Sequence, residues 1–259
     1  MSVPAIVLAG ERPGGNALAK TFGEPSGVLV DVAGKPCITR TIEALMASTS
    51  VYRGILCGPD PATRAMSPVI RELLETTPFT WLPPQEGPAQ SALAALGTLD
   101  PQPVLLTAAD HALLTPQIVD GFCRLALLTD ADFVVGLVPY PLVKAAFPQS
   151  RRTVLKFADG AYCGSNLFMI RTPLGNRLLT FWRDIQQHRK KPWRMATAIG
   201  LGTLAAYLTG RLTLQAALEA VGDRAGCRVA HVEVLEPRAA VDVDSVADHA
   251  LAEEILGGC

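Results

Sequence analysis

Three aspartates stand where a folded chain could gather carboxylates around a bound cation. Asp110 lies just beyond the short apolar run 104–107, which predicts a buried strand ending at the ligand-binding edge of a sheet. Asp242 and Asp244 alternate along an extended segment, so their side chains share one face. Each has a structural alternative, because Asp110 could cap a helix or loop and the later pair could serve turn chemistry before a helix.

A glycine-rich loop at 10–16 is the second candidate. It follows the apolar run 3–9, which is short, rich in β-branched residues and stopped by Gly10, and which therefore predicts a strand. Glu11 and Arg12 lie among its glycines. Backbone N–H groups and a guanidinium at the carboxyl edge of an open α/β sheet suit a phosphate group, although Arg12 could also be a solvated loop cation.

A second loop is expected beside the first. The segment 83–91 turns at Gly87 into an alanine-rich helix, so its polar groups would face the same edge of the sheet. A ligand could therefore be held from two loops. The residues of the second loop that would face it are Gln85, Glu86, Gly87 and Ser91.

Cationic and amide side chains follow elsewhere in the chain. Lys35 precedes a helix, where it could contact a phosphate or simply extend along the surface. Arg152 and Lys156 lie near predicted antiparallel pairing, and their charge suits either an anionic ligand or surface solubility. Asn166 could contact a ligand or fix a turn, because asparagine tolerates left-handed conformations. The run 188–194, HRKKPWR, is either a solvated face or a cationic patch for an anionic acceptor or lipid headgroup.

The elements that position these side chains alternate between strand and helix. Apolar runs at 51–56, 79–82, 104–107 and 133–138 predict strands, and the segments between them predict helices. This alternation is typical of a parallel sheet with right-handed crossovers. Periodicity is lost from 139 to 150, after which a hairpin turn at Asp159 and Gly160 predicts antiparallel pairing.

The remaining segments complete an α/β fold. Alternating valines at 28–32 predict a strand or extended segment. Helices are expected over 173–218, among them a packed helix over 195–210 that is too short and too rich in glycine to span a membrane. A strand at 227–234 precedes a final helix, which Ser245 caps with Asp248 at the capping-box position.

Composition limits the partners. The chain has 259 residues, a net charge of −1 and a pI near 6.4, so we expect no nucleic-acid partner. Six cysteines without C-x-x-C spacing favour reduced thiols over a disulfide scaffold or a zinc site. The first residues lack the basic region of a signal peptide, and we expect a cytoplasmic protein without stable membrane insertion. We expect a single domain over 1–259 with a helical insertion at 173–222.

Six motifs together resemble the MobA-like NTP transferases, and they follow that family's order from one end of the chain to the other. This resemblance implies a Rossmann-like sheet of the GT-A type with a mixed distal part and an appended helical layer. It also implies transfer of a nucleoside monophosphate from an NTP to a small phosphorylated acceptor, with Mg²⁺ as cofactor. The motifs are LAGERPGG (8–15), VAGKP (32–36), EGPAQSALAAL (86–96), LLTAADHALLTP (105–116), GSNLF (164–168) and VDVDSVADHALAEEIL (241–256).

The resemblance also implies roles for particular residues. The half 1–138 would bind the nucleotide and the half 139–259 the acceptor. Arg12, Lys35 and Asp110 would be catalytic, and Asp110, Asp242 and Asp244 would supply carboxylates for the metal. The acceptor would meet Arg152, Lys156 and Asn166. The nucleotide would contact Leu8, Ala9, Gly10, Glu11, Arg12, Glu86, Gly87, Ser91 and Asp110.

One position departs from the family. The family usually places a lysine at the position of Gly27, where it neutralises triphosphate charge, and Lys35, Lys20, Arg12 or Lys156 would have to replace it. An alternative is therefore a nucleotide-binding homologue with weakened or lost catalysis. A Rossmann oxidoreductase is disfavoured, because the loop lacks G-x-G-x-x-G in the right register. A partner at the membrane surface, bound through 189–194, is the remaining hypothesis.

Overall fold

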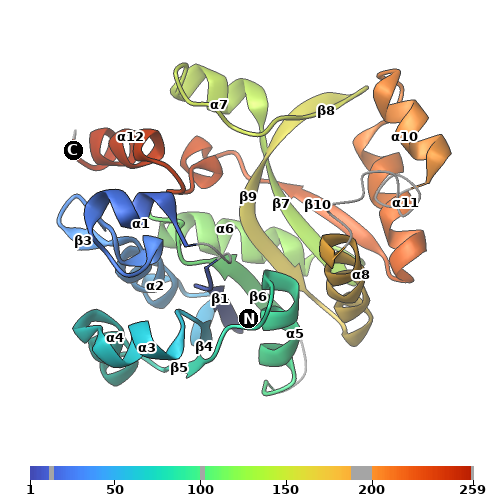
Figure 1. Ribbon diagram of the computed structural model, residues 1–259. Helices are drawn as coiled ribbons and strands as arrows, with labels where there is room; N and C mark the ends of the chain where they lie inside the picture. The colour runs from blue at the N-terminus through green and yellow to red at the C-terminus, as the bar shows by residue number, and fades with distance from the viewer. Residues whose placement is uncertain (12–14, 100–102, 188–199, 258–259) are drawn as a thin grey trace.

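The computed structural model describes residues 1–11, 15–99, 103–187 and 200–257, and a mixed eight-stranded sheet lies at its centre (Figure 1). Its strands are β1 (Val3–Leu8), β4 (Val51–Cys57), β5 (Phe79–Leu82), β6 (Val104–Ala108), β7 (Phe133–Pro139), β8 (Leu155–Phe157), β9 (Gly160–Ile170) and β10 (Val229–Glu233). The order across the sheet is β10-β7-β9-β6-β1-β4-β5, and β8 pairs with β9. A separate two-stranded hairpin joins β2 (Asp31–Val32) to β3 (Lys35–Pro36).

The strands of the first half are parallel, as the alternation predicts. β1 lies between β4 and β6, and β4 continues the parallel set to β5. Side chains of β1 are buried on both faces, which explains its continuous apolar sequence. The parallel arrangement brings the carboxyl ends of β1, β4 and β6 to one edge of the sheet.

β9 reverses the direction of the sheet. It pairs antiparallel with β6 on one side and with β7 on the other, so the two halves of the chain share one sheet. The register with β7 shifts between Val135 and Leu137, where three residues of β9, 165–167, face a single residue of β7. Asn166 occupies this bulge with φ 52°, a conformation that asparagine tolerates. The predicted mixed distal part is confirmed.

Helices cover both faces of the sheet. One apolar cluster packs α2 and α6 against one face, and a second cluster packs α5 and α8 against the other. A third cluster joins α1 to α12 beside the first loops of the chain. The helices are α1 (Ala17–Phe22), α2 (Cys37–Ala47), α3 (Pro61–Met66), α4 (Pro68–Thr76), α5 (Pro88–Leu96), α6 (Pro116–Leu127), α7 (Tyr140–Ala146), α8 (Asn176–Gln187), α10 (Leu201–Leu208), α11 (Leu214–Ala225) and α12 (Val246–Gly257).

The predicted helix caps are confirmed. Ser67 and Thr115 each accept a hydrogen bond from a backbone N–H three residues on, at 3.3 Å, and so begin α4 and α6. Ser245 forms the predicted capping box of α12. Its hydroxyl accepts from the Asp248 N–H at 3.2 Å, and the Asp248 carboxylate accepts from the Ser245 N–H at 3.0 Å.

Two local expectations are wrong in detail. The segment 28–32, predicted to be extended, begins as a 3₁₀ turn, η1 (Gly27–Leu29), because four of its valine and leucine side chains pack into different clusters instead of lining one strand. The stretch without periodicity at 139–150 contains α7. Only Val143 of α7 is buried, so a helix this short leaves no periodic pattern to detect.

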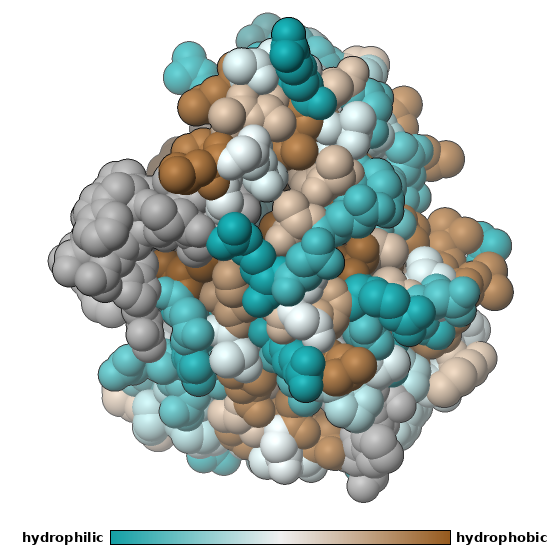
Figure 2. Space-filling view, turned by 90° about the vertical axis from the view of Figure 1, so that its right-hand side faces the viewer, coloured by the Kyte–Doolittle hydropathy of each residue, from teal (hydrophilic) through white to brown (hydrophobic). Residues whose placement is uncertain are grey.

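Helix α10 is far less buried than expected. It holds no buried residue, and Leu201 and Leu208 are 68% and 74% exposed, so the prediction of a packed helix is wrong for this part. The face of the molecule that carries α10 and α11 shows hydrophobic surface between hydrophilic side chains (Figure 2). Residues 195–199 and the basic run 188–194 lie outside the described residues. Among the residues that are described, no helix has the length and apolarity needed to cross a bilayer.

Candidate functional site

The loops that follow β1, β4 and β6 meet at the carboxyl edge of the sheet. Ala109 N–H donates to the Leu8 carbonyl at 2.9 Å, and Ala9 N–H donates to the Cys57 carbonyl at 2.8 Å. The loop after β4 approaches so closely that a Cβ atom on Gly58 would lie 2.7 Å from the Ala9 carbonyl carbon. Gly58 also has φ +98°, so glycine is required there on two counts. The predicted first loop therefore starts beside Asp110.

Asp110 lies between helix α2 and the late Asp-Val-Asp segment. The Val243 N–H donates to the Asp110 carbonyl at 3.0 Å, which joins residues 133 positions apart in the chain. Thr41 of α2 donates its hydroxyl to the Ala109 carbonyl at 3.1 Å. Burial, and after it the negative charge of Asp110, raises the pKa of Cys37 to about 12, so this thiol stays protonated. The predicted carboxylates on the two segments are brought to the same edge.

Asp242 and Arg152 belong to one network of hydrogen bonds. The Arg152 guanidinium, 8% exposed, forms ion pairs with the carboxylates of both Asp242 and Asp248. Its Nε also donates to the Ser150 hydroxyl at 3.0 Å. The second carboxylate oxygen of Asp242 accepts from the Asn166 amide at 3.3 Å. Arg152 and Asn166, both predicted to meet the acceptor, thus each contact Asp242, which is predicted to hold the metal.

This network bears on the predicted roles of its members. Two carboxylates neutralise the charge of Arg152, and its side chain joins the segment before β8 to Asp242 and to Asp248 in the first turn of α12. Lys156 is exposed on β8, apart from these contacts. In the described part of the chain, no three side chains of His, Cys, Asp or Glu are grouped as a complete metal site. The acceptor and metal roles remain predictions.

The described ends of the first loop fold against Gly27. The Glu11 carboxylate accepts from the Gly27 N–H at 2.6 Å. The Asn16 side chain packs so tightly there that a Cβ atom on Gly27 would lie 2.2 Å from its Nδ2. A side chain at position 27 would therefore require the Asn16 side chain to shift. Arg12, predicted to be catalytic and to bind nucleotide, lies outside the described residues.

The second loop stands beside an open cavity of about 370 Å³. The Ser91 hydroxyl, which is buried, accepts from the Gln85 N–H at 2.9 Å and so fixes the loop at the start of α5. Glu86 is exposed and lines the cavity. Sequence reasoning missed Gln90 and Arg183, because Arg183 comes from α8, almost a hundred residues away. The cavity is lined by Gln85, Glu86, Gln90, Leu93, Ala94 and Arg183.

Lys35 forms an ion pair at the surface, whereas His111 is buried in the interior. The Lys35 ammonium pairs with Glu43 at 2.8 Å, and both side chains are half exposed. His111 follows Asp110 but is fully buried, and burial lowers its pKa to about 4, an effect that the nearby Ala239 backbone partly offsets. His111 is therefore a neutral imidazole in the protein interior.

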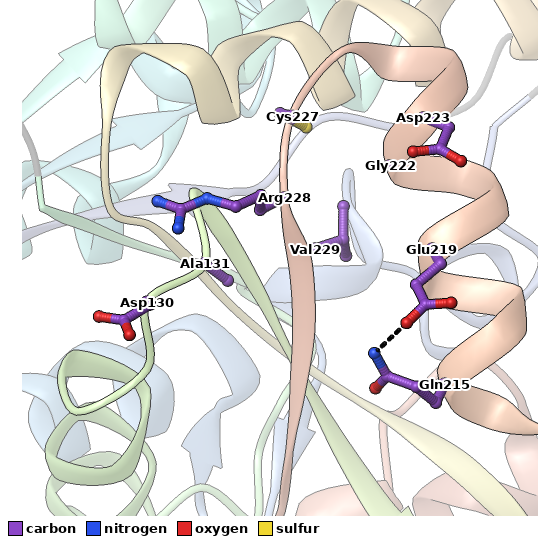
Figure 3. A pocket seen from close by; sticks show the side chains of 9 residues that line it. All are labelled: Asp130, Ala131, Gln215, Glu219, Gly222, Asp223, Cys227, Arg228 and Val229. Atoms are coloured by element: carbon purple, nitrogen blue, oxygen red, sulfur yellow. Dashed lines mark hydrogen bonds between the residues drawn. The ribbon is translucent and has the colours of Figure 1, made fainter.

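A second pocket lies at the opposite edge of the sheet (Figure 3). Ala131 precedes β7 and Val229 begins β10, and both strands start there. Helix α11 forms the other wall, with Gln215 donating to Glu219 at 2.8 Å. The pocket measures about 310 Å³ and contains none of the predicted site residues. This pocket therefore plays no part in the predicted chemistry.

One protein family and several solved structures are similar to this chain. A family described as the MobA-like NTP transferase domain matches residues 5–162. None of the curated proteins matches the chain in sequence. A solved structure of a hypothetical transferase from Thermus thermophilus is 28% identical, with a TM-score of 0.80 over 96% of this chain and 100% of that one.

Two further solved structures share the fold at lower identity. One is 4-diphosphocytidyl-2C-methyl-D-erythritol synthase from Anaerococcus prevotii, which is 11% identical with a TM-score of 0.60 over 99% of this chain and 96% of that one. The other is CMP:2-keto-3-deoxy-manno-octonic acid synthetase in complex with CTP, which is 14% identical with a TM-score of 0.60 over 99% of each chain. These two likenesses support the expected Rossmann-like fold.

Proposed function

Because this chain belongs to the family of MobA-like NTP transferase domains, we propose that it transfers a nucleoside monophosphate from an NTP to a small phosphomonoester and releases pyrophosphate. The acceptor would be a sugar, polyol or pterin phosphate. The observation that carries the proposal is the hydrogen bond from Val243 to Asp110. It unites the two predicted carboxylate segments beside the loop that follows β1, at the edge where such sheets bind ligands.

The residues at this edge are compatible with Mg²⁺. Magnesium is usually held by one or two protein carboxylates together with substrate phosphates, so a complete protein cage is not needed. Asp110 and Asp244 would hold it, and Asp242 would join them with the oxygen lone pairs that Arg152 and Asn166 leave available. A bound Mg²⁺ would neutralise phosphate charge as a Lewis acid.

The reaction itself joins two phosphates. An oxygen of the acceptor phosphate attacks the α-phosphorus of the NTP and forms a new P–O bond, while the bond to the bridging oxygen breaks and pyrophosphate leaves with that electron pair. Backbone N–H groups of the loop after β1 would orient the triphosphate. The cavity beside Glu86 and Ser91 would receive the base and ribose. CTP is the first NTP to test, because one structure of similar fold was solved with it.

A nucleotide-binding protein with lost catalysis is the second candidate. The observation that favours it is Gly27, which stands where the family usually has a lysine and packs against the Asn16 side chain. This candidate predicts binding of NTP without turnover.

One experiment separates the two candidates. Pyrophosphate release is measured for each of the four NTPs with Mg²⁺ against sugar, polyol and pterin phosphates. We expect turnover with at least one pair, and a loss of about 10²-fold or more in Asp110→Asn. Asp130→Asn, an exposed carboxylate at the opposite edge, is the matched control and keeps full activity. Silence with every pair, together with calorimetric binding of Mg²⁺ and NTP, would overturn the proposal in favour of the binding protein.

A further inference from the structure

We propose that Arg152 is the internal counter-ion of the Asp242 carboxylate, and that Asp242 must leave this guanidinium in order to bind Mg²⁺. This inference rests on the proposed function and deepens it, because it gives the metal a competitor within the chain. The contact lies where the segment before β8 meets the start of α12. Arg152 would therefore set the affinity of the site for Mg²⁺.

The Arg152 guanidinium has more negative partners than its charge requires. It forms ion pairs with the carboxylates of both Asp242 and Asp248. It also donates to the Ser150 hydroxyl at 3.0 Å and to the Asp242 backbone carbonyl at 3.3 Å. Removing every partner from a buried charge is costly, but one positive charge needs only one carboxylate. One of the two carboxylates can therefore leave while Arg152 stays paired.

The two carboxylates are not equally committed to other contacts. Asp248 belongs to the capping box of α12, where one of its oxygens accepts from the Ser245 N–H at 3.0 Å and from the Ser245 hydroxyl at 2.6 Å. The second oxygen of Asp242 accepts from the Asn166 amide at 3.3 Å, just beyond the usual range for such a bond. The Asp242 side chain is also the more exposed of the two. Asp242 is therefore the partner that can leave, and Asp248 the one that keeps Arg152.

Asp242 is held beside the other predicted metal ligand. The next residue, Val243, donates its N–H to the Asp110 carbonyl at 3.0 Å. Mg²⁺ is usually bound by one or two carboxylates together with phosphate oxygens and water. A carboxylate oxygen that already accepts from a guanidinium has fewer lone pairs for a metal, and its negative charge is partly balanced. Arg152 therefore lowers the affinity for Mg²⁺ as long as it stays on Asp242.

The same contact stabilises the protein when no metal is bound. Asp242 and Asp248 would repel each other if no cation paired with both of them, and the guanidinium removes that repulsion. A divalent cation on Asp242 can take over this role. Metal binding and stability are therefore linked, and a chain without the guanidinium gains more stability from Mg²⁺ than the wild type does.

The test measures Mg²⁺ binding with and without the guanidinium. In calorimetric titrations with magnesium chloride at constant ionic strength, we expect Arg152→Met to bind Mg²⁺ about tenfold more tightly than the wild type, as for removal of one positive charge close to a divalent ion in surroundings near those of water. In urea, Arg152→Met should also gain more stability from Mg²⁺ than the wild type. Arg152→Gln keeps an N–H donor for the carboxylates and should bind Mg²⁺ as tightly, so it replaces Arg152→Met if that variant does not fold.

Arg171→Met is the matched control. The Arg171 guanidinium also joins segments of the chain, but it donates to backbone carbonyls, those of Ala131 and Leu127, at 2.9 and 3.2 Å. Ala131 lies at the opposite edge of the sheet. Arg171→Met should therefore lower stability without changing the affinity for Mg²⁺. An equal rise in affinity in Arg171→Met and Arg152→Met would overturn the proposal.

A double-mutant cycle separates competition for Asp242 from repulsion through space. In the Asp242→Asn background the neutral amide has no ion pair to give up, so adding Arg152→Met should change the affinity for Mg²⁺ by less than about twofold. The same rise in both backgrounds would mean that Arg152 repels the metal without competing for Asp242, and the proposal would be wrong.

These measurements do not depend on turnover. If the wild type transfers nucleotide and Arg152→Met binds Mg²⁺ no more tightly, the competition is refuted and the proposed function stands. If no NTP is turned over but the affinity rises as expected, the proposed function fails and the competition stands. Absence of Mg²⁺ binding in the wild type and in both Arg152 variants would overturn the competition as well.

Discussion

Replacing Arg152 by methionine separates a structural role of this residue from the predicted contact with the acceptor. The guanidinium is 8% exposed and lies between two carboxylates, Asp242 at 30% and Asp248 at 16% exposure. Methionine keeps most of the volume of the side chain but removes its charge and its donors. If the ion pairs hold the C-terminal segment in place, the substitution lowers the free energy of unfolding even when no ligand is bound.

The expected magnitude follows from burial. Breaking a buried ion pair by removing one partner costs about 3–5 kcal/mol, and since both carboxylates keep some contact with water we expect about 3 kcal/mol. For a chain of this size that corresponds to a fall in Tm of roughly 6–12 °C. Urea unfolding of the ligand-free protein gives the free energy directly, provided that the slope with denaturant stays the same. Arg151→Met, an exposed neighbour, is the matched control and should stay within about 0.5 kcal/mol of the wild type.

One outcome would contradict a structural role of Arg152. If Arg152→Met unfolds at the same free energy as Arg151→Met, the ion pairs with Asp242 and Asp248 do not hold the segment together. A loss of acceptor affinity at unchanged stability would then return Arg152 to its predicted role as a contact of the acceptor phosphate.

Three further perturbations test other parts of the structure. Ser245→Ala removes the capping box of α12 and should lower the free energy of unfolding by about 1 kcal/mol in urea. Gly58→Ala should cost about 2 kcal/mol or more, since its φ is +98° and its Cβ would meet the Ala9 backbone, whereas Gly210→Ala, with φ +69° and open space, should cost less. The pKa of His111 is about 4 in the folded state against 6.5 when unfolded, so the unfolded state binds more protons and stability falls as the pH drops below 6.5. Between pH 6.5 and 5 this amounts to about 2 kcal/mol, and urea unfolding of His111→Leu at the two pH values should show that loss reduced.

Local sequence patterns were sufficient for the strands of the first half and for three helix caps. The run at Val3–Leu8 is buried except for its last residue, and Ser67, Thr115 and Ser245 cap helices as expected, because each of these features depends on neighbours in sequence. The partners of Arg152 lie 90 and 96 positions away, and no local pattern encodes such contacts.

Placement of the site residues was predictable only in part. The position of Asp110 at the end of β6 follows from the sequence, whereas its bond to Val243 depends on how the C-terminal segment returns to the sheet. The tight packing of the Asn16 side chain against Gly27 could not be predicted, because these two residues are eleven positions apart in the sequence. The exposure of helix α10 was not predictable either, since an apolar composition does not reveal whether other elements cover a helix.

The position of β9 has a consequence for how the protein is made. A ribosome releases β6 and then β7 before β9, yet β9 pairs between these two strands in the finished sheet. Until residue 170 has emerged, β6 has an open edge, and β7 has no place beside it. A nascent chain that paused near residue 140 would expose one edge of β6 and both edges of β7. The two halves of the sheet are therefore joined in the middle by a strand that arrives after both of its neighbours, and β10 is added last at the edge.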